Sequence, residues 1–200
     1  MNLADPNDVG LTHVPASLLA TLSSTSGAMT IRQLARSSGV SLARAQHWVN
    51  HWAERGVVIQ RQAGSAVMCS VNYEHLMTPS LLALARVRET MIERIAADVA
   101  DWDIPPLSVT AFGSFARGDG SITSDIDLLV VHESSEQQIW HRQLESSAET
   151  LEHAFGNPIQ WLDFPRSTWL EMCTRADPLV AEVRRDAIHI FGEYLTLISK

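Results

Sequence analysis

Residues 113–131 read GSFARGDGSITSDIDLLVV, and the rest of the chain is best interpreted from this stretch outward. The apolar run just before it, residues 109–112, predicts a buried strand. Gly113 and Ser114 end that run with a tight turn, where backbone can approach a ligand closely. A second apolar, β-branched run, residues 126–131, predicts another strand. The polar residues 117–124 between the two runs predict a loop or the start of a short helix.

Two carboxylates, Asp125 and Asp127, stand at the start of the second expected strand. Side chains at positions i and i+2 of a strand leave the same face, so both carboxylates are expected to point the same way. Carboxylates that share a cleft repel each other, and a hard divalent cation such as Mg²⁺ (or Mn²⁺) relieves the repulsion, often together with nucleotide phosphates. The pair therefore indicates a metal site. The alternative is that the two aspartates only mark the N-terminal end of a strand, since Asp-x-Asp pairs are common there.

Taken whole, the stretch resembles the signature of the nucleotidyltransferase superfamily related to DNA polymerase β, in which Gly-Ser is followed after a short spacer by Asp-x-Asp. It is most similar to the small bacterial minimal nucleotidyltransferases, whose pattern is GSxARGxxxxxSDxDLxV. The resemblance implies that Asp125 and Asp127 are catalytic and bind Mg²⁺. It also implies that ATP or another nucleoside triphosphate is held by four residues: Gly113, Ser114, Arg117 and Ser124.

The third acid of that family is expected on the strand that follows the long helix, where it acts as general base or metal ligand. Here residues 157–164 read NPIQWLDF, and Gln160 occupies the matching position. An amide cannot take up a proton or supply charge to a metal. Asp163 is the other candidate for the third catalytic acid, but its odd offset from Gln160 puts it on the opposite face unless a bulge shifts the register. Strict alternation predicts that Gln160, not Asp163, faces the metal pair.

The N-terminal part predicts three helices, the first beginning at Pro15, with a short turn between the second and the third, and then a β-hairpin. Thr30 is expected to cap a helix whose inner residues are Ile31, Leu34 and Ala35. Ser41 is expected to cap a longer helix over residues 42–55, ended by Gly56. The inner residues of this longer helix are Ala45, Val49 and Trp52. Residues 57–61 and 67–71 are β-rich runs around the turn 62–65.

This order resembles the winged helix-turn-helix of MarR- and ArsR-type regulators. The resemblance implies that residues 42–55 form a recognition helix that lies in the major groove of DNA. Arginine reads guanine, and asparagine or glutamine reads adenine, through paired hydrogen bonds, while further arginines contact phosphates. The candidate DNA-binding residues are Arg44, Gln46, His47, Asn50 and Arg61. A protein-docking role for this part of the chain is the alternative.

The chain is thus expected to be α+β, with a winged helix-turn-helix over 1–77, a connector helix over 78–104 and a nucleotidyltransferase fold with a small mixed sheet over 105–200. Residues 1–14 are expected to be a loose lead-in. The connector is expected to be one long amphipathic helix, with a homodimer surface and plain core packing as alternatives. After the signature, a helix over 135–155 is expected to bury Ile139 and Trp140 among others. A strand over 159–164, short helices over 166–174 and 177–186, and a last strand over 187–191 follow.

Composition and charge indicate how the domains differ and in which compartment the protein is expected. The 200 residues carry a net charge of −8. Residues 1–75 hold five Arg against four acidic residues, and residues 76–200 hold ten basic against 19 acidic residues. This asymmetry is expected of two domains with different partners. Two distant cysteines, no signal-like start and no apolar run of about 20 residues indicate a cytoplasmic protein without a membrane span.

Two functions remain open from the sequence. The first is a transferase that moves a nucleoside monophosphate, AMP from ATP in the first instance, to the hydroxyl of a protein or small molecule, which includes the toxin-neutralising role of some family members. The second is a transcriptional regulator or antitoxin that binds DNA and keeps the nucleotidyltransferase fold as a nucleotide sensor. The intact Gly-Ser and Asp-x-Asp favour the first, and Gln160 favours the second.

Overall fold

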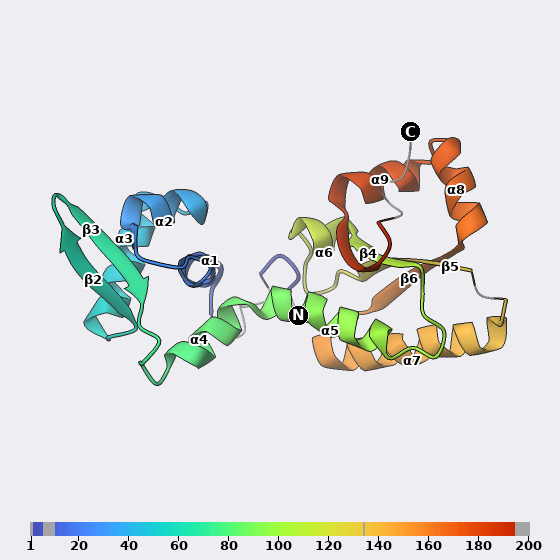
Figure 1. Ribbon diagram of the computed structural model, residues 1–200, viewed down its shortest axis with the longest axis horizontal. Coiled ribbons are helices and arrows are strands. Elements are labelled where there is room, and N and C mark those ends of the chain that lie inside the picture. Colours follow the sequence, from blue (N-terminus) through green and yellow to red (C-terminus); the bar gives the residue numbers. More distant parts are fainter. Residues whose placement is uncertain (1, 6–10, 134, 195–200) are drawn as a thin grey trace. The chain divides into compact units, whose positions relative to one another are not determined.

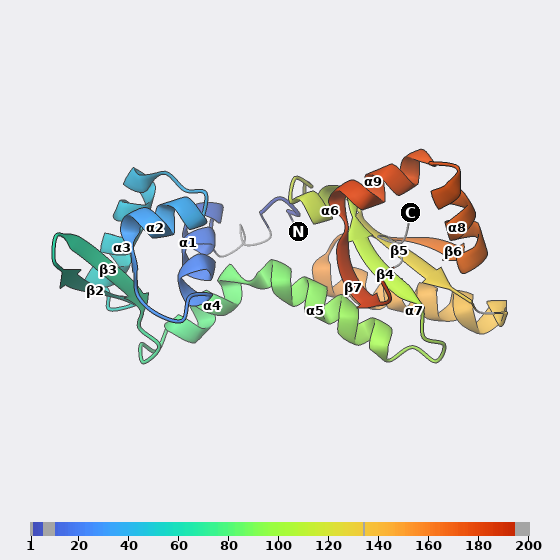
Figure 2. The same ribbon diagram turned by 45° about the horizontal axis from the view of Figure 1, so that its top comes forward.

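The computed structural model describes residues 2–5, 11–133 and 135–194. Its contacts divide the chain into two compact units, Asn7–Val87 and Met1–Pro6 with Arg88–Lys200. Each unit encloses its own hydrophobic core. Figures 1 and 2 show the elements of both units. Across the described residues, no helix combines the length and the apolar character that crossing a bilayer requires.

The unit Asn7–Val87 combines helices with one small antiparallel sheet, in the order β1-β3-β2. Its elements are α1 (His13–Ser23), β1 (Met29–Thr30), α2 (Ile31–Ser37), α3 (Leu42–Glu54), β2 (Val58–Ala63), β3 (Ala66–Val71) and α4 (Thr78–Ala85). The predicted inner residues of α2 and α3 are all buried, which confirms the periodicity argument for both helices.

The prediction is met at the start of α2, and it differs in detail at the β2–β3 hairpin and at the start of α3. Thr30 caps α2 as predicted, in a capping box with Gln33. The β2–β3 hairpin is tighter than predicted, because Ala63 pairs with Ala66 and only two residues form the turn. Gly64 permits this turn with its positive φ of 60°. Ser41 stands at the N-cap position of α3 as predicted, but its side chain makes no capping hydrogen bond there.

The predicted connector helix is two helices, α4 and α5 (Val87–Ala100), separated at Arg86. Arg86 has φ −108° and ψ 17°, outside the helical region. Ala85, at the end of α4, packs into the core of the unit Asn7–Val87. Met91 and Ile95 on α5 belong to the core of the other unit. A continuous apolar stripe in the sequence cannot reveal that its two halves pack into different cores.

The second unit is built on a mixed four-stranded sheet with the order β6-β5-β4-β7. β4 is antiparallel to β5 and β7, and β5 is parallel to β6. Besides α5, its elements are β4 (Ser108–Phe112), α6 (Gly113–Arg117), β5 (Ile126–His132), α7 (Gln137–Phe155), β6 (Ile159–Pro165), α8 (Arg166–Thr174), α9 (Pro178–Asp186) and β7 (Ile188–Gly192). A mixed α/β arrangement with small sheets is therefore observed, as the sequence predicted.

Helices cover both faces of this sheet (Figure 2). On one face, Ile126, Leu128 and Val130 of β5 pack with residues of α5 and α7. On the other face, Leu129 and Val131 pack with residues of α8 and α9. This strict alternation along β5 assigns every position of the strand to one face or the other. The prediction that Ile139 is an inner residue of α7 is wrong, because Ile139 is 37% exposed.

The prediction of a loose lead-in at the N-terminus is also wrong for the described residues 2–5. The Leu3 side chain is fully buried in the core formed by α5, α7 and the sheet. The backbone N–H groups of Leu3 and Ala4 donate to the carbonyl oxygens of Ser121 and Gly120, in the loop between α6 and β5. A single buried leucine within a polar stretch leaves no periodic pattern, so this contact could not be predicted from the sequence.

Candidate nucleotide and metal site

The turn from β4 into α6 brings backbone directly against one of the two carboxylates. Gly113 has φ +67°, and a Cβ added there would lie 2.5 Å from Oδ2 of Asp127. Phe112, the last residue of β4, pairs with Asp127 of β5 across the sheet. Only glycine fits this position, because both its conformation and the space beside it exclude a side chain. The structure thus brings Gly113 and Asp127 together, and the half-buried Ser114 is the next residue.

Asp125 and Asp127 share one negatively charged environment. Asp125 is exposed just before β5, and Asp127 is half-buried within it. Burial raises the pKa of Asp127, and the charges of Asp125 and Glu182 raise it further, while Arg117 opposes them. Carboxylate oxygens with an unrelieved negative charge are a donor set that fits Mg²⁺ or Mn²⁺.

Carboxylates alone do not complete a metal site in this part of the molecule. Within the described ranges, no group of three or more His, Cys, Asp or Glu side chains has an arrangement that could hold a metal ion. A cation held by Asp125 and Asp127 therefore needs further oxygen ligands, which the phosphates of a nucleotide can supply.

The register of β5 and β6 decides which residue stands at the third position. Asp127 pairs with Gln160, so their side chains lie side by side on the same face of the sheet. This agrees with the alternation predicted for residues 159–162, and Gln160 is exposed there. An amide therefore stands at the position where the nucleotidyltransferase resemblance leads us to expect a third carboxylate.

The expectation that Asp163 joins the two carboxylates is not met. Asp163 pairs with Val130, which faces the opposite side of the sheet. There its Oδ2 accepts a hydrogen bond of 3.0 Å from Nε1 of Trp140, and its Oδ1 lies 3.2 Å from Nε2 of His132. Because no bulge interrupts the β5–β6 pairing from Ile126 to His132, Asp163 remains a structural partner of α7.

Ser124 lies in the loop before Asp125, where its hydroxyl takes part in closing the turn. Its Oγ accepts a hydrogen bond of 2.8 Å from the N–H of Ser121. Its carbonyl oxygen accepts one of 3.1 Å from the amide of Asn157. In the described structure Ser124 therefore shapes the loop that leads to the carboxylates.

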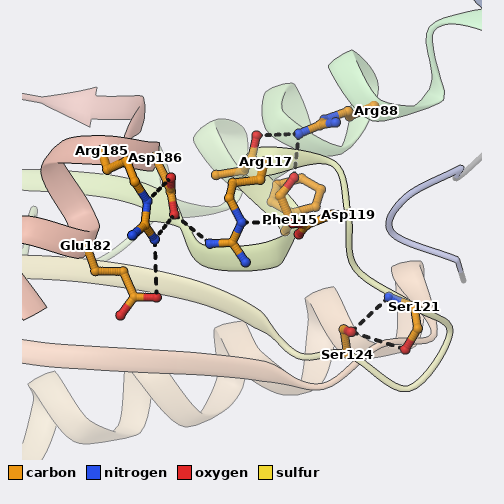
Figure 3. A network of polar contacts seen from close by, with 10 residues as sticks. Arg88, Phe115, Arg117, Asp119, Ser121, Ser124, Glu182, Arg185 and Asp186 are labelled. Atoms are coloured by element: carbon orange, nitrogen blue, oxygen red, sulfur yellow. Dashed lines mark hydrogen bonds and ion pairs between the residues drawn. The ribbon is translucent and has the colours of Figure 1, made fainter.

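Arg117 ends α6 and is held in a network of charged side chains (Figure 3). Its Nε donates to Asp119 at 3.0 Å, and its Nη1 donates to Asp186 at 2.5 Å. Asp186 also accepts two hydrogen bonds of 2.8 Å from Arg185. Hydrogen bonding from Arg185 first, and from Arg117, lowers the pKa of Asp186 to about 2. Asp186 is therefore a carboxylate at every pH near neutrality.

Sequence reasoning missed four residues that surround this site, because all of them lie outside the signature. Arg88 of α5 donates to the carbonyl oxygens of Phe115 and Ala116, and its guanidinium lies 5.5 Å from the centre of the Phe115 ring. It therefore holds the C-terminal end of α6. The other three residues, Glu182, Arg185 and Asp186, lie on α9. No local pattern marks them, since they reach the site only through tertiary packing.

The candidate DNA-binding residues of the other unit lie mostly on the exposed face of α3. Arg44, Gln46 and His47 are exposed there, and Arg61 is exposed on β2. Asn50 is also exposed, but its Oδ1 accepts hydrogen bonds of 3.0 Å from both Gln46 and Gln60. A paired contact with adenine needs that same oxygen as an acceptor. Asn50 therefore bridges α3 and β2, and its contact with DNA stays a prediction.

Comparison with known proteins gives a family match over part of the chain. Among solved structures, one described as a crystal structure of a toxin-antitoxin with AMP-PNP is 19% identical, covering 53% of this chain and 74% of that chain, with a TM-score of 0.35. No curated protein matches this chain. Residues 92–170, from within α5 to within α8, match the family described as the nucleotidyltransferase domain.

Proposed function

We propose that this protein binds a nucleoside triphosphate, ATP in the first instance, together with Mg²⁺, and transfers the nucleoside monophosphate to a hydroxyl group of a protein or small molecule. The observation that carries the proposal is the contact of Gly113 with Asp127, beside Asp125, within the residues that match the nucleotidyltransferase family. Backbone free of a side chain next to paired carboxylates suits a phosphate–metal complex, because a large charged ligand can approach closely.

The chemistry is a substitution at phosphorus. The acceptor oxygen forms a bond to the α-phosphorus of the nucleotide, the bond from that phosphorus to the bridging oxygen breaks, and pyrophosphate leaves with the electron pair. Asp125 and Asp127 would hold Mg²⁺, which supplies neutralisation of the charge that develops on the phosphates. Gly113 and Ser114 would position those phosphates. The acceptor proton must leave to water, since Gln160 cannot accept it, and the transfer is therefore expected to be slow.

Binding of the nucleotide is expected to depend on both carboxylates. We expect the wild-type protein to bind ATP in the presence of Mg²⁺, and the double variant Asp125→Asn/Asp127→Asn to lose at least about tenfold in affinity, because neutral amides no longer attract the metal. Isothermal titration calorimetry with and without Mg²⁺ measures this. The matched control is Asp101→Asn/Asp103→Asn, another Asp-x-Asp pair in the same unit. Equal affinity of wild type and the Asp125/Asp127 variant would rule out the site.

A second function is favoured by the amide of Gln160 beside Asp127. In this alternative the nucleotide is bound but not consumed, and the protein is a regulator or antitoxin that senses it. The unit Asn7–Val87 would then act as a winged helix-turn-helix. Support comes from α2 and α3 in succession, the three-stranded sheet and the tight hairpin after α3.

DNA binding by that unit is expected to depend on Arg44. We expect a gel shift with DNA from upstream of the protein's own coding sequence, weakened by salt because phosphate contacts release counterions. Arg44→Ala is expected to weaken binding by about 1–3 kcal/mol if its guanidinium reads a guanine. Arg175→Ala, at an exposed arginine just after α8, serves as the control. A shift that is insensitive to salt, or equal in both variants, would contradict this assignment.

A further inference from the structure

We propose that Asp186 is a positioning residue, which holds the guanidinium of Arg117 ready for the β- or γ-phosphate of the bound nucleoside triphosphate. The inference rests on the proposed nucleotide binding and adds to it a part of the chain outside the matched residues 92–170. α9, which carries Asp186, would thereby complete the site. The claim concerns binding geometry, and Asp186 itself touches no substrate.

The contacts of Asp186 fit this role. Its side chain is 4% exposed, at the C-terminal end of α9. It accepts a hydrogen bond from Arg117 on one side and two from Arg185 on the other (Figure 3). Two guanidinium groups on one carboxylate fix its orientation, and charge-assisted hydrogen bonds of this kind are stronger than neutral ones. Asp186 is therefore a rigid anchor for Arg117.

Arg117 in turn has hydrogen-bond donors to spare. It belongs to α6, which begins at Gly113 against Asp127, and its charge acts on Asp127. Nε and Nη1 are used by Asp119 and Asp186. Nη2 has no hydrogen-bond partner among the residues that the structure describes, and the side chain is 35% exposed. Arginine binds phosphate through such outward N–H groups, so the remaining donors suit a phosphate oxygen.

The anchor also keeps Arg117 away from the metal position. Asp119 alone would be a weak tether, because its side chain is 60% exposed and exposed ion pairs contribute little. A guanidinium without Asp186 could instead pair with Asp127, on which its charge already acts, and would then compete with Mg²⁺. Asp186 removes this competition by accepting one hydrogen bond from Arg117 while two from Arg185 hold the carboxylate in place.

The test is a double-variant cycle on Asp186 and Arg117, read by calorimetry with Mg·ATP and with AMP. We expect Asp186→Asn to weaken ATP binding by about tenfold, the loss of one charge-assisted contact, while AMP binding stays the same. In the Arg117→Met background, Asp186→Asn is expected to have no further effect on ATP. Glu171→Gln, on α8, removes the ion-pair partner of the exposed Arg175; it is the control and is expected to bind like wild type.

The outcomes separate the two proposals. If the wild type binds no Mg·ATP, the proposed function is wrong, and the inference falls with it. If the wild type binds but Asp186→Asn binds equally well, or if its effect persists fully in Arg117→Met, Asp186 does not act through Arg117. Should Asp186→Asn fail to fold, Arg117→Lys decides: it keeps the charge but loses the forked geometry, so an unchanged preference for ATP over AMP would overturn the inference.

Discussion

Replacing Gln160 by aspartate is expected to raise the rate of Mg²⁺-dependent nucleotidyl transfer by about 10²-fold or more. Gln160 pairs with Asp127 on the same face of the sheet, so the new carboxylate would stand beside the existing pair. It would take the proton of the attacking hydroxyl, a contribution of about 10²–10⁴-fold for a positioned general base. It would also add a charged oxygen ligand for the metal.

The measurement is transfer from ATP labelled in its α-phosphate, with a cell lysate as the source of acceptors. Gln138→Asp, an exposed position in the first turn of α7, controls for the added negative charge. Asp163→Asn is expected to leave the rate unchanged, because Asp163 faces α7. Robust wild-type transfer that Asp163→Asn alone abolishes would show that Asp163 acts as the catalytic acid, and it would refute the role given to Gln160.

Truncating Leu3 to alanine is expected to lower the free energy of unfolding by about 2–5 kcal/mol, the usual range for a leucine removed from a packed core. Leu3 is fully buried among residues of α5, α7 and the sheet. It also lies against Gly120, where an added Cβ would come within 2.8 Å of the Leu3 side chain. The variant is therefore expected to loosen the loop between α6 and β5 as well.

Urea unfolding followed by tryptophan fluorescence measures the loss. The matched control is Leu76→Ala, because Leu76 is 90% exposed and substitutions at such positions usually change stability by less than about 0.5 kcal/mol. Equal stability of the two variants would show that residues 2–5 do not contribute to the core in solution.

Much of the local structure followed from the sequence, for identifiable reasons. The inner faces of α2 and α3 were predictable because apolar residues recur at helical spacing. The strand before Gly113 and the strand after Asp125 were predictable from short β-rich runs and the turn residues between them. The alternation of residues 159–162 even predicted that Gln160 shares a face with Asp127. Each of these inferences needed only residues that are close together in the chain.

The errors share a different cause. The break at Arg86, the burial of Leu3 and the exposure of Ile139 each depend on which core a residue meets. The hydrogen bond from Gln60 of β2 to Asn50 of α3 likewise joins residues on two separate elements. None of these contacts leaves a periodic signal in the sequence, because the partner lies on a separate element.

The sequence by itself determined the candidate nucleotide site: Gly113, Ser114, Asp125 and Asp127 lie within one stretch, and the geometry of a strand and a turn brings them together. The tertiary structure decided the remainder. Strand pairing assigned Gln160 and Asp163 to opposite faces, and the packing of α9 brought Asp186 to Arg117. The physical reason is that side-chain direction along a strand is a local property, whereas strand register and helix docking are set by burial of residues far apart in the chain.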